Sequence, residues 1–283
     1  MTFSIVARSE SGPNGNPEWG VAVASKFLAV GNAVPAAVAG VGAIATQADA
    51  NVAFKGIGLS LLDEGATATV ALDRLLEEDP KRNHRQVGIV DVDGGAATHT
   101  GSACFDWAGG VSGDGFAIQG NILAGPEVVE AMKDAWTDSD PESPLAHRLL
   151  EALAAGDAAG GDKRGRQSAA LLVVSEGAGY GGMDDVAVDL RVDDHAAPIT
   201  ELTRLLGLND LYLTASTEAE RIEVTPELAA EIDGLVKAAG HPNLAAWVGT
   251  ENYEMRVAED GSWIDPKILG ILRGGPGAEE QAD

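Results

Sequence analysis

The chain has 283 residues, 45% hydrophobic and 22% charged, which is enough for one large domain or for one domain with a small appendage. Its 44 acidic and 19 basic residues give a formal net charge of −25, which argues against a general nucleic-acid-binding role because phosphate contacts need clusters of lysine and arginine. A single cysteine excludes an intramolecular disulfide. No signal-peptide pattern or membrane-spanning apolar run is evident, so we expect a cytoplasmic protein without a membrane partner.

The start of the chain predicts an antiparallel hairpin. Residues 2–8 and 19–24 are rich in β-favouring apolar side chains, and a turn-rich segment, residues 11–17, separates them. Because the hairpin loop lies at the end remote from Thr2, we expect Lys26, which follows the second strand, to lie near Thr2. There Lys26 would lower the pKa of an α-amine or stabilise developing negative charge; a solvated lysine at a strand end is an equal alternative.

The next segments predict strands at 34–38 and 41–45, followed by helices at 57–63 and 67–78. A polar stretch, residues 46–51, separates the second of these strands from the first helix. Connecting segments of this kind often carry binding residues. Gln47 and Asn51 are therefore candidates for holding a substrate, with ordinary turn roles as the alternative.

The second half of the chain repeats this alternation of strand pairs and helix pairs. The predicted elements are a hairpin over 86–92 and 96–99, a strand pair within 107–119, helices after Pro126 and over 145–155 ending at Gly156, strands at 171–174 and 185–192, and a short helix over 198–206 ending at Gly207. Strand pairs separated by helix pairs predict antiparallel sheets with helices in the outer layers. The expected fold is α+β, in the form of a four-layer αββα sandwich.

Thr2 is the first candidate for covalent chemistry. If Met1 is trimmed, Thr2 carries both a hydroxyl nucleophile and a free α-amine, whose usual pKa of about 7.7–8.0 suits a general base near neutral pH. A threonine activated by its own N-terminal amine is a recognised form of nucleophilic catalysis. Threonine is also common in strands, so a purely structural role is the alternative.

Four segments carry a family resemblance: MTFSIVAR (1–8), GVAVASKF (20–27), QGNILAG (119–125) and GDKRGRQSAA (161–170). Together they closely resemble DUF1028, an uncharacterised bacterial and archaeal family, over roughly residues 1–205. That family is usually grouped with the N-terminal nucleophile (Ntn) hydrolases, so the resemblance implies the αββα sandwich and amide-bond hydrolysis by an N-terminal Thr, Ser or Cys. Thr2 falls on the nucleophile position.

The resemblance also indicates a departure from the proteasome-like members of that superfamily. Lys26 stands near the end of the second strand, where those members usually carry an acidic residue, and their later lysine is not evident, with Asn32 and Pro35 in that region. The departure favours a small amide substrate, or no catalysis, over proteasome-like proteolysis.

Further polar residues are candidates for the same site. Asn121 is the first candidate for an oxyanion-hole donor, whose loss typically costs about 10²–10³ in rate; a structural turn role is the alternative. Asp162, Arg164 and Arg166 belong to the one basic cluster of this acidic chain. An arginine there could clamp a substrate carboxylate, with Asp162 as its ion-pair partner, and ion pairs between loops or subunits explain the cluster at least as well.

No metal and no cofactor are expected. His99, Cys104 and Asp106 lie close in sequence, but their spacing matches no standard zinc pattern and no second ligand pair lies nearby.

The sequence pattern changes after Gly207. We expect a sandwich domain over 1–206, a connector over 207–220, a small, mostly helical domain over 221–274 and a flexible acidic tail over 275–283. The segment 221–274 resembles only weakly the tails of related chains described as peptidoglycan-binding. A packing or oligomerisation role is favoured, and in the second case the chain would form a homo-oligomer.

The sequence therefore predicts a cytoplasmic N-terminal nucleophile amidohydrolase that acts on a small-molecule amide through Thr2 after removal of Met1. The alternative is a non-catalytic binding or assembly subunit with the Ntn fold, which retention of Met1 would support. A wall- or glycan-binding protein ranks last because it would need secretion and a functional C-terminal segment.

Overall fold

The computed structural model describes residues 2–274 and divides the chain into two compact units after Thr203. The expected acidic tail, 275–283, lies outside the described residues, as does Met1. The division falls within one helix, α6 (Pro198–Tyr212), three residues before the boundary expected at 206.

The first unit is built on two antiparallel sheets. The six-stranded sheet has the order β10-β9-β2-β1-β8-β7 and contains β1 (Thr2–Ser9), β2 (Glu18–Ser25), β7 (Gly109–Gly113), β8 (Phe116–Asn121), β9 (Ser168–Val174) and β10 (Val186–Val192). The four-stranded sheet has the order β3-β4-β5-β6 and contains β3 (Pro35–Val38), β4 (Gly42–Ala48), β5 (Arg85–Asp91) and β6 (Ala96–Thr100). β1 and β2 form the hairpin predicted at the start of the chain.

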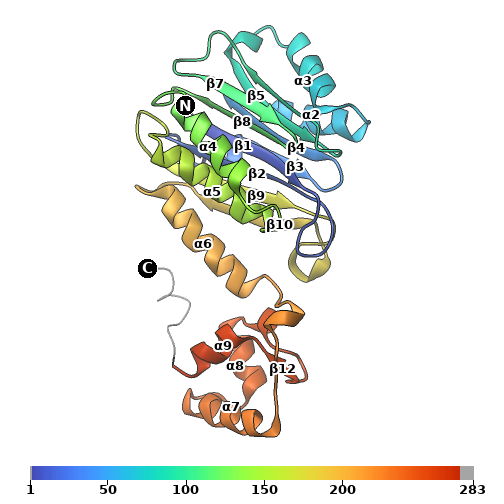
Figure 1. Cartoon of the computed structure of the whole chain (residues 1–283), viewed down its shortest axis with the longest axis vertical. Coiled ribbons are helices and arrows are strands. Elements are labelled where there is room, and N and C mark those ends of the chain that lie inside the picture. The colour runs from blue at the N-terminus through green and yellow to red at the C-terminus, as the bar shows by residue number, and fades with distance from the viewer. Residues whose placement is uncertain (1, 275–283) are drawn as a thin grey trace. The chain divides into compact units, whose positions relative to one another are not determined.

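Helix pairs cover the outer faces of the two sheets, as Figure 1 shows. α4 (Glu127–Asp138) and α5 (Leu145–Ala158) pack on the six-stranded sheet, while α2 (Ala53–Asp63) and α3 (Ala68–Glu77) pack on the four-stranded sheet. A short helix, α1 (Val30–Ala33), contacts β2 and β9. The α+β fold with an αββα layer order is therefore confirmed.

The space between the sheets is apolar over one part of its area. Side chains from both sheets meet there with almost no exposed surface, among them Val6, Val21, Val23, Ala43, Ala45 and Val90. Valine and alanine suit this position because their short side chains let two pleated surfaces approach closely. Burying each valine contributes on the order of 1.5–3 kcal/mol, so this layer is a main source of stability.

Two glycines do not end their helices as predicted. α5 continues through Gly156 to Ala158. A Cβ at Gly156 would lie 2.6 Å from Cγ of Met132 in α4, so a glycine at this position allows the two helices to pack closely. α6 continues through Gly207 to Tyr212, and Leu206 and Leu211 on either side of this glycine are buried. One exposed glycine costs a helix only about 1 kcal/mol relative to alanine, which the burial of two leucines offsets.

Gly207→Ala is expected to stabilise the protein by about 0.5–1 kcal/mol, because Gly207 is helical and exposed and a Cβ there would have no neighbouring atom within 4 Å. The measurement is the midpoint of thermal unfolding. Gly58→Ala in α2 is the matched control: its Cβ would lie 2.9 Å from Ile44, so the same substitution should lower stability. A Gly207→Ala midpoint at or below that of the unmodified protein would contradict this account.

The second unit has its own small core. It contains the two-stranded sheet β11 (Ile222–Glu223) and β12 (Trp263–Ile264) and the helices α7 (Pro226–Ala238), α8 (Leu244–Glu251) and α9 (Pro266–Leu272). The fully packed side chains include Ile232, Val236, Trp247, Tyr253, Ile264 and Ile268. A buried ion pair joins Nη1 of Arg256 to Oδ2 of Asp265 at 3.1 Å, and the Ser216 hydroxyl donates to the same oxygen at 2.6 Å.

None of the helices within residues 2–274 combines the length and apolar character needed to cross a membrane.

Candidate functional site

A row of polar residues crosses the middle of the six-stranded sheet at one of its ends. Ser168 pairs with Ser25, and Thr2 pairs with Asn121, so the row runs over β9, β2, β1 and β8. Each of the four residues stands at the first or last position of its strand. The register of these strands therefore brings Thr2 and Asn121, two of the predicted catalytic residues, side by side.

The Thr2 side chain is held by a second hydroxyl. Oγ1 of Thr2 lies 3.1 Å from Oγ of Ser25, and only 6% of Thr2 is exposed. The carbonyl oxygen of Thr2 accepts a hydrogen bond from Nε2 of Gln47 at 3.2 Å. Ser25, which lies within the segment GVAVASKF, was not identified as a site residue from the sequence. The signal was available, since pairing of residues 2–8 with 19–24 sets Ser25 opposite Thr2.

Asp162 joins the end of β2 to the loop that precedes β9. Its buried carboxylate accepts hydrogen bonds from the backbone N–H of Lys26 at 2.7 Å and of Arg164 at 2.9 Å. The guanidinium of Arg164 lies 3.2 Å from the same carboxylate. Asp162 also forms an isolated bridge with Leu123, just beyond β8, and so sits close to the ends of both β2 and β8.

The arginines of the basic cluster already have carboxylate partners. Arg164 pairs with Asp162, and Nε of Arg166 donates to both carboxylate oxygens of Asp157 in α5, at 2.8 and 2.9 Å. Hydrogen bonding to Asp157 raises the pKa of Arg166. Arg164 therefore pairs within its own loop and Arg166 with a residue of a helix, and a substrate-binding role for either arginine stays a prediction.

A small pocket opens beside this row, with room for about one water molecule. Its polar wall contains Ser25, Asp162, Arg166 and Ser168, and its apolar wall contains Phe3, Ala24, Pro198 and Ile199. Ser25 lines the pocket and its hydroxyl contacts that of Thr2, so this residue links the pocket to the candidate nucleophile.

Among the described residues, the ammonium group of Lys26 forms no direct hydrogen bond with Thr2. Nζ of Lys26 instead donates to the carbonyl oxygen of Arg166 at 3.2 Å, which places it at a residue of the pocket wall. The side chain is exposed. A direct effect of Lys26 on the α-amine of Thr2 stays a prediction.

Gln47 and Asn121 belong to a layer of amide side chains buried between the two sheets. Oε1 of Gln86 accepts from Nδ2 of Asn121 at 2.8 Å and from Nε2 of Gln47 at 2.9 Å. Oε1 of Gln47 accepts from the Ser4 hydroxyl, which in turn accepts from Gln119, both at 2.7 Å. Burial of so many polar groups is tolerated because each is hydrogen-bonded, and such layers fix the relative register of packed sheets.

The expected polar connector over 46–51 is partly strand. β4 continues to Ala48, because pairing of residues 42–48 with β5 satisfies its backbone and Gln47 faces Gln86 in the same ladder. Asn51 lies beyond the strand and its side chain contacts Asp79, so the structure separates Gln47 from Asn51. Their joint role in holding a substrate stays a prediction that this placement does not support.

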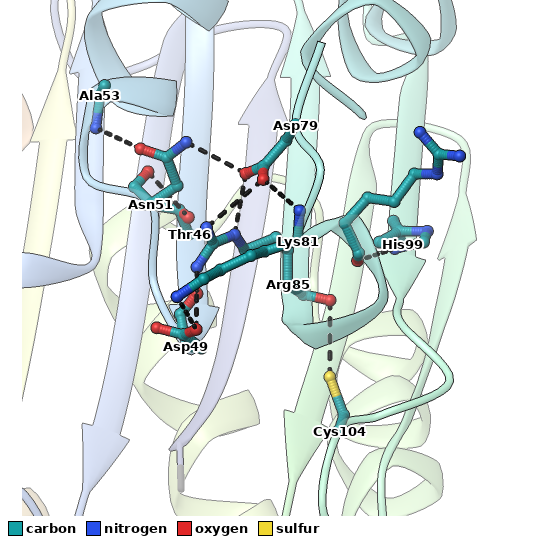
Figure 2. A network of polar contacts seen from close by, with 10 residues as sticks. Thr46, Asp49, Asn51, Ala53, Asp79, Lys81, Arg85, His99 and Cys104 are labelled. Atoms are coloured by element: carbon teal, nitrogen blue, oxygen red, sulfur yellow. Dashed lines mark hydrogen bonds and ion pairs between the residues drawn. The ribbon is translucent and has the colours of Figure 1, made fainter. Parts of the chain in front are cut away.

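Asn51 belongs to a second polar cluster, at the ends of the two central strands of the four-stranded sheet, shown in Figure 2. Nδ2 of Asn51 donates to the Asp79 carboxylate at 3.1 Å, and Nε of Arg85 donates to the same carboxylate at 2.8 Å. Arg85 extends between Asp79 and Asp49, with Nη1 3.2 Å from Oδ2 of Asp49. The hydrogen bond from Arg85 is the main cause that lowers the pKa of Asp79 from 3.8 to about 2.

Asp79→Asn is expected to remove about 2 kcal/mol of stability at neutral pH. Because the folded-state pKa of Asp79 is about 2 against 3.8 for the free group, its contribution is present above pH 3.8 and is lost as the pH falls through 2. Urea unfolding of the unmodified and variant proteins should therefore show a stability difference that shrinks between pH 5 and pH 2. Asp189→Asn, which breaks a surface pair with Arg191, should change stability by under about 1 kcal/mol; a pH-independent difference for Asp79→Asn would refute the assignment.

His99 and Cys104, weighed above as metal ligands, contact backbone carbonyls. Nε2 of His99 lies 3.0 Å from the carbonyl oxygen of Arg82, in the 3₁₀ turn η1 (Arg82–His84), and Sγ of Cys104 donates to that of Arg85 at 3.5 Å. Burial raises the pKa of the Cys104 thiol. Across residues 2–274, no three His, Cys, Asp or Glu side chains are grouped so that they could hold a metal ion.

Non-glycine residues with positive φ, a strained backbone conformation, occur beside both polar clusters. Ile122, directly after Asn121, has φ 49°, an unfavourable conformation for a β-branched residue. It is held there by its N–H donating to the carbonyl of Phe105 at 2.9 Å and its carbonyl accepting from Lys163 at 3.3 Å. Ala29 and Ala48 also have positive φ, 52° and 68°. Strain of about 1–3 kcal/mol persists where surrounding structure enforces it, which occurs often at functional sites.

Comparisons with known proteins agree with the sandwich. The model of a family of unknown function, DUF1028, matches residues 2–202. The crystal structure of a DUF1028 protein from Silicibacter pomeroyi is similar with a TM-score of 0.65 and 30% identity, over 74% of this chain and 89% of that one. Anbu (ancestral beta-subunit) from Yersinia bercovieri matches with a TM-score of 0.32 and 10% identity, over 73% and 93% of the two chains, too low to carry an argument. No curated protein matches.

Proposed function

Because this chain belongs to the DUF1028 family, whose function is unknown, we propose a function from its own geometry: hydrolysis of a small amide by Thr2 after Met1 is removed. The observation that carries the proposal is the position of Thr2. Its hydroxyl lies 3.1 Å from that of Ser25, at the first residue of a central strand and next to a pocket lined by Ser25 and Asp162. Removal of one residue would place a nucleophile and an α-amine together in this setting.

The chemistry needs only Thr2 and water. The α-amine takes the proton of the Thr2 hydroxyl as Oγ1 forms a bond to the amide carbon, and the carbon–nitrogen bond then breaks as the departing amine takes that proton. The acyl group is left as an ester of Thr2. Water, deprotonated by the same amine, attacks the ester, so an acid is released and the threonine is restored.

Ser25 is a positioning residue in this scheme. A hydrogen bond at 3.1 Å orients the Thr2 hydroxyl, and the rigid strand pairing of β1 with β2 keeps the two groups together. Asn121 is the side-chain candidate for stabilising the oxyanion. One N–H of its amide is used by Gln86, and an amide nitrogen carries two hydrogens, so a second donor remains for chemistry.

The test begins with the intact mass of the purified protein, which shows whether Met1 is removed. The protein is then treated with a neutral β-lactone, an electrophile that acylates hydroxyl nucleophiles. The mass of the N-terminal peptide of the protein is measured afterwards. We expect loss of Met1 and a single lactone adduct on Thr2, absent from Thr2→Ala. Retained Met1 would exclude the mechanism, because an amide nitrogen has no basic lone pair to accept the proton.

The non-catalytic alternative also has a specific observation in its favour. Thr2 is 6% exposed, and the amide layer behind it is hydrogen-bonded throughout, which is what a purely structural core would require. A binding or assembly subunit is the function to pursue if the lactone leaves Thr2 unmodified.

A further inference from the structure

We propose that two copies of this chain associate through β10, which pairs antiparallel with β10 of the second copy about a two-fold axis at Leu190. The sequence favoured a packing or oligomerisation role for residues 221–274, whereas this contact belongs to the first unit. The inference goes beyond the proposed hydrolysis and does not depend on it, because the contact uses none of the residues around Thr2.

β10 is an edge strand of the six-stranded sheet, with β9 on one side of it (Figure 1). An edge strand leaves alternate backbone N–H and C=O groups free to pair with another strand. The opposite edge strand, β7, packs against β6 of the other sheet. Within the first unit the main neighbour of β10 is β9, so the outer side of β10 is the edge on which another strand can be added.

The regular part of β10 defines where such pairing would be centred. The register of β10 with β9 shifts between Val186 and Val188, so the regular part runs over residues 188–192 and has Leu190 at its centre. Pairing this part with itself places Leu190 opposite Leu190 of the second copy, and Val188 opposite Val192. These residues share one face of the strand, because side chains alternate along it. Leu190 is half-buried in one chain and would be covered by its counterpart.

The same register is electrostatically self-complementary. It places Asp189 of each copy opposite Arg191 of the other, and the two-fold axis repeats this pair. Within one chain the two side chains already pair, with Nε of Arg191 2.9 Å from Oδ1 of Asp189, and they are 44% and 39% exposed. Moving the axis by one residue would set two aspartates or two arginines opposite each other, which is unfavourable. Charge therefore selects the register centred on Leu190.

Exposed apolar side chains lie near both ends of β10. Tyr180 and Met183, which precede the strand, are 78% and 92% exposed. After the strand, the carbonyl of Asp193 accepts a hydrogen bond from the N–H of Ala29 at 3.0 Å, so Leu28, which is 60% exposed, lies next to that end. Antiparallel pairing brings the start of one strand to the end of the other. The contact would therefore bring these apolar groups of the two copies together.

The experiment measures the mass of the full chain by sedimentation velocity over a series of protein concentrations. A contact centred on one short strand is small, so we expect a reversible dimer with a Kd of about 10 µM. Asp189→Arg sets two arginines opposite each other and Arg191→Asp sets two aspartates, so each should weaken dimerisation by about tenfold or more. The double variant restores opposite charges and should restore the dimer.

Glu231→Arg is the matched control for charge reversal. Glu231 forms an exposed ion pair with Arg273 at 2.7 Å in the second unit, so its reversal should leave the dimer unchanged. A chain that stays monomeric at every concentration, single reversals that leave the dimer intact, or a double variant that remains monomeric would each overturn the inference.

A cysteine at the axis tests the register directly. In a Cys104→Ser background, Leu190→Cys places two thiols opposite each other, where a Cα separation of about 4.5–5.5 Å permits a disulfide. Oxidised glutathione, which is reduced as the two thiols are oxidised, should link the copies into a dimer on a non-reducing gel. Ala187→Cys in the same background should stay unlinked, because this register sets Ala187 opposite Asp193. Equal cross-linking of the two variants would overturn the register.

Discussion

Thr2→Ala is expected to lower kcat/KM for amide hydrolysis by about 10³-fold or more, to the background of the assay. Removing the nucleophile of a covalent mechanism eliminates the route through the acyl-enzyme, and what remains comes only from binding and from oxyanion stabilisation. The fold should be little affected, because Thr2 is the first residue of β1 and its backbone pairing with β8 does not depend on the side chain. The measurement is the release of free amine, followed over time with purified protein.

Two further substitutions separate nucleophilic chemistry from structure at this position. Thr2→Ser keeps both a hydroxyl and, after Met1 removal, an α-amine, so it should retain a substantial share of the activity. Ser25→Ala leaves the nucleophile in place but removes the hydrogen bond at 3.1 Å, and should reduce kcat with little change in KM. If Thr2→Ala protein hydrolyses the substrate as fast as the unmodified protein, the activity belongs to another residue.

The residue opposite Thr2 in the hairpin could be predicted because it depends on local pairing. A hairpin of residues 2–8 with 19–24 fixes which residues stand opposite one another, and the observed pairing of Phe3 with Ala24 follows that expectation. The helices and hairpins of both halves, and hence the layer order, could also be predicted from periodicity and turn residues. Sequence patterns of this kind report on neighbours within the chain.

The surroundings of Thr2 could not be predicted in the same way because they depend on distant segments. Gln47 was assigned to a connector because a polar stretch, residues 46–51, follows an apolar run, yet pairing of β4 with β5 places Gln47 against Gln86, 39 positions away. Asn51 joins Asp79 and Arg85 through contacts that no local pattern indicates. Gly156 is similar, since only the position of Met132 in α4 explains why a helix carries a glycine there.

Gln86→Ala is expected to destabilise the first unit by about 3–5 kcal/mol. Gln86 is fully buried; its Oε1 accepts from Gln47 and Asn121, and its Nε2 donates to the carbonyl of Gly120 at 2.7 Å and to Thr100 at 2.9 Å. Alanine would leave several of these groups without partners between the sheets, at about 1–3 kcal/mol for each, and would open a cavity. The same change would free the Asn121 side chain, so any oxyanion role of Asn121 would weaken with it.

The readout for Gln86→Ala should report on the first unit alone, because tryptophans occur in both units and unfolding of the whole chain mixes them. Hydrogen–deuterium exchange of peptides from β1 and β8 under increasing urea meets this need. Gln167→Ala is the matched control: Nε2 of Gln167 donates to Asp194 at 3.0 Å on the surface, and its loss should cost under about 1 kcal/mol. Equal costs for the two variants would mean that water enters the inter-sheet layer and replaces the lost amide, and the layer would then not hold Asn121 and Thr2 in fixed register.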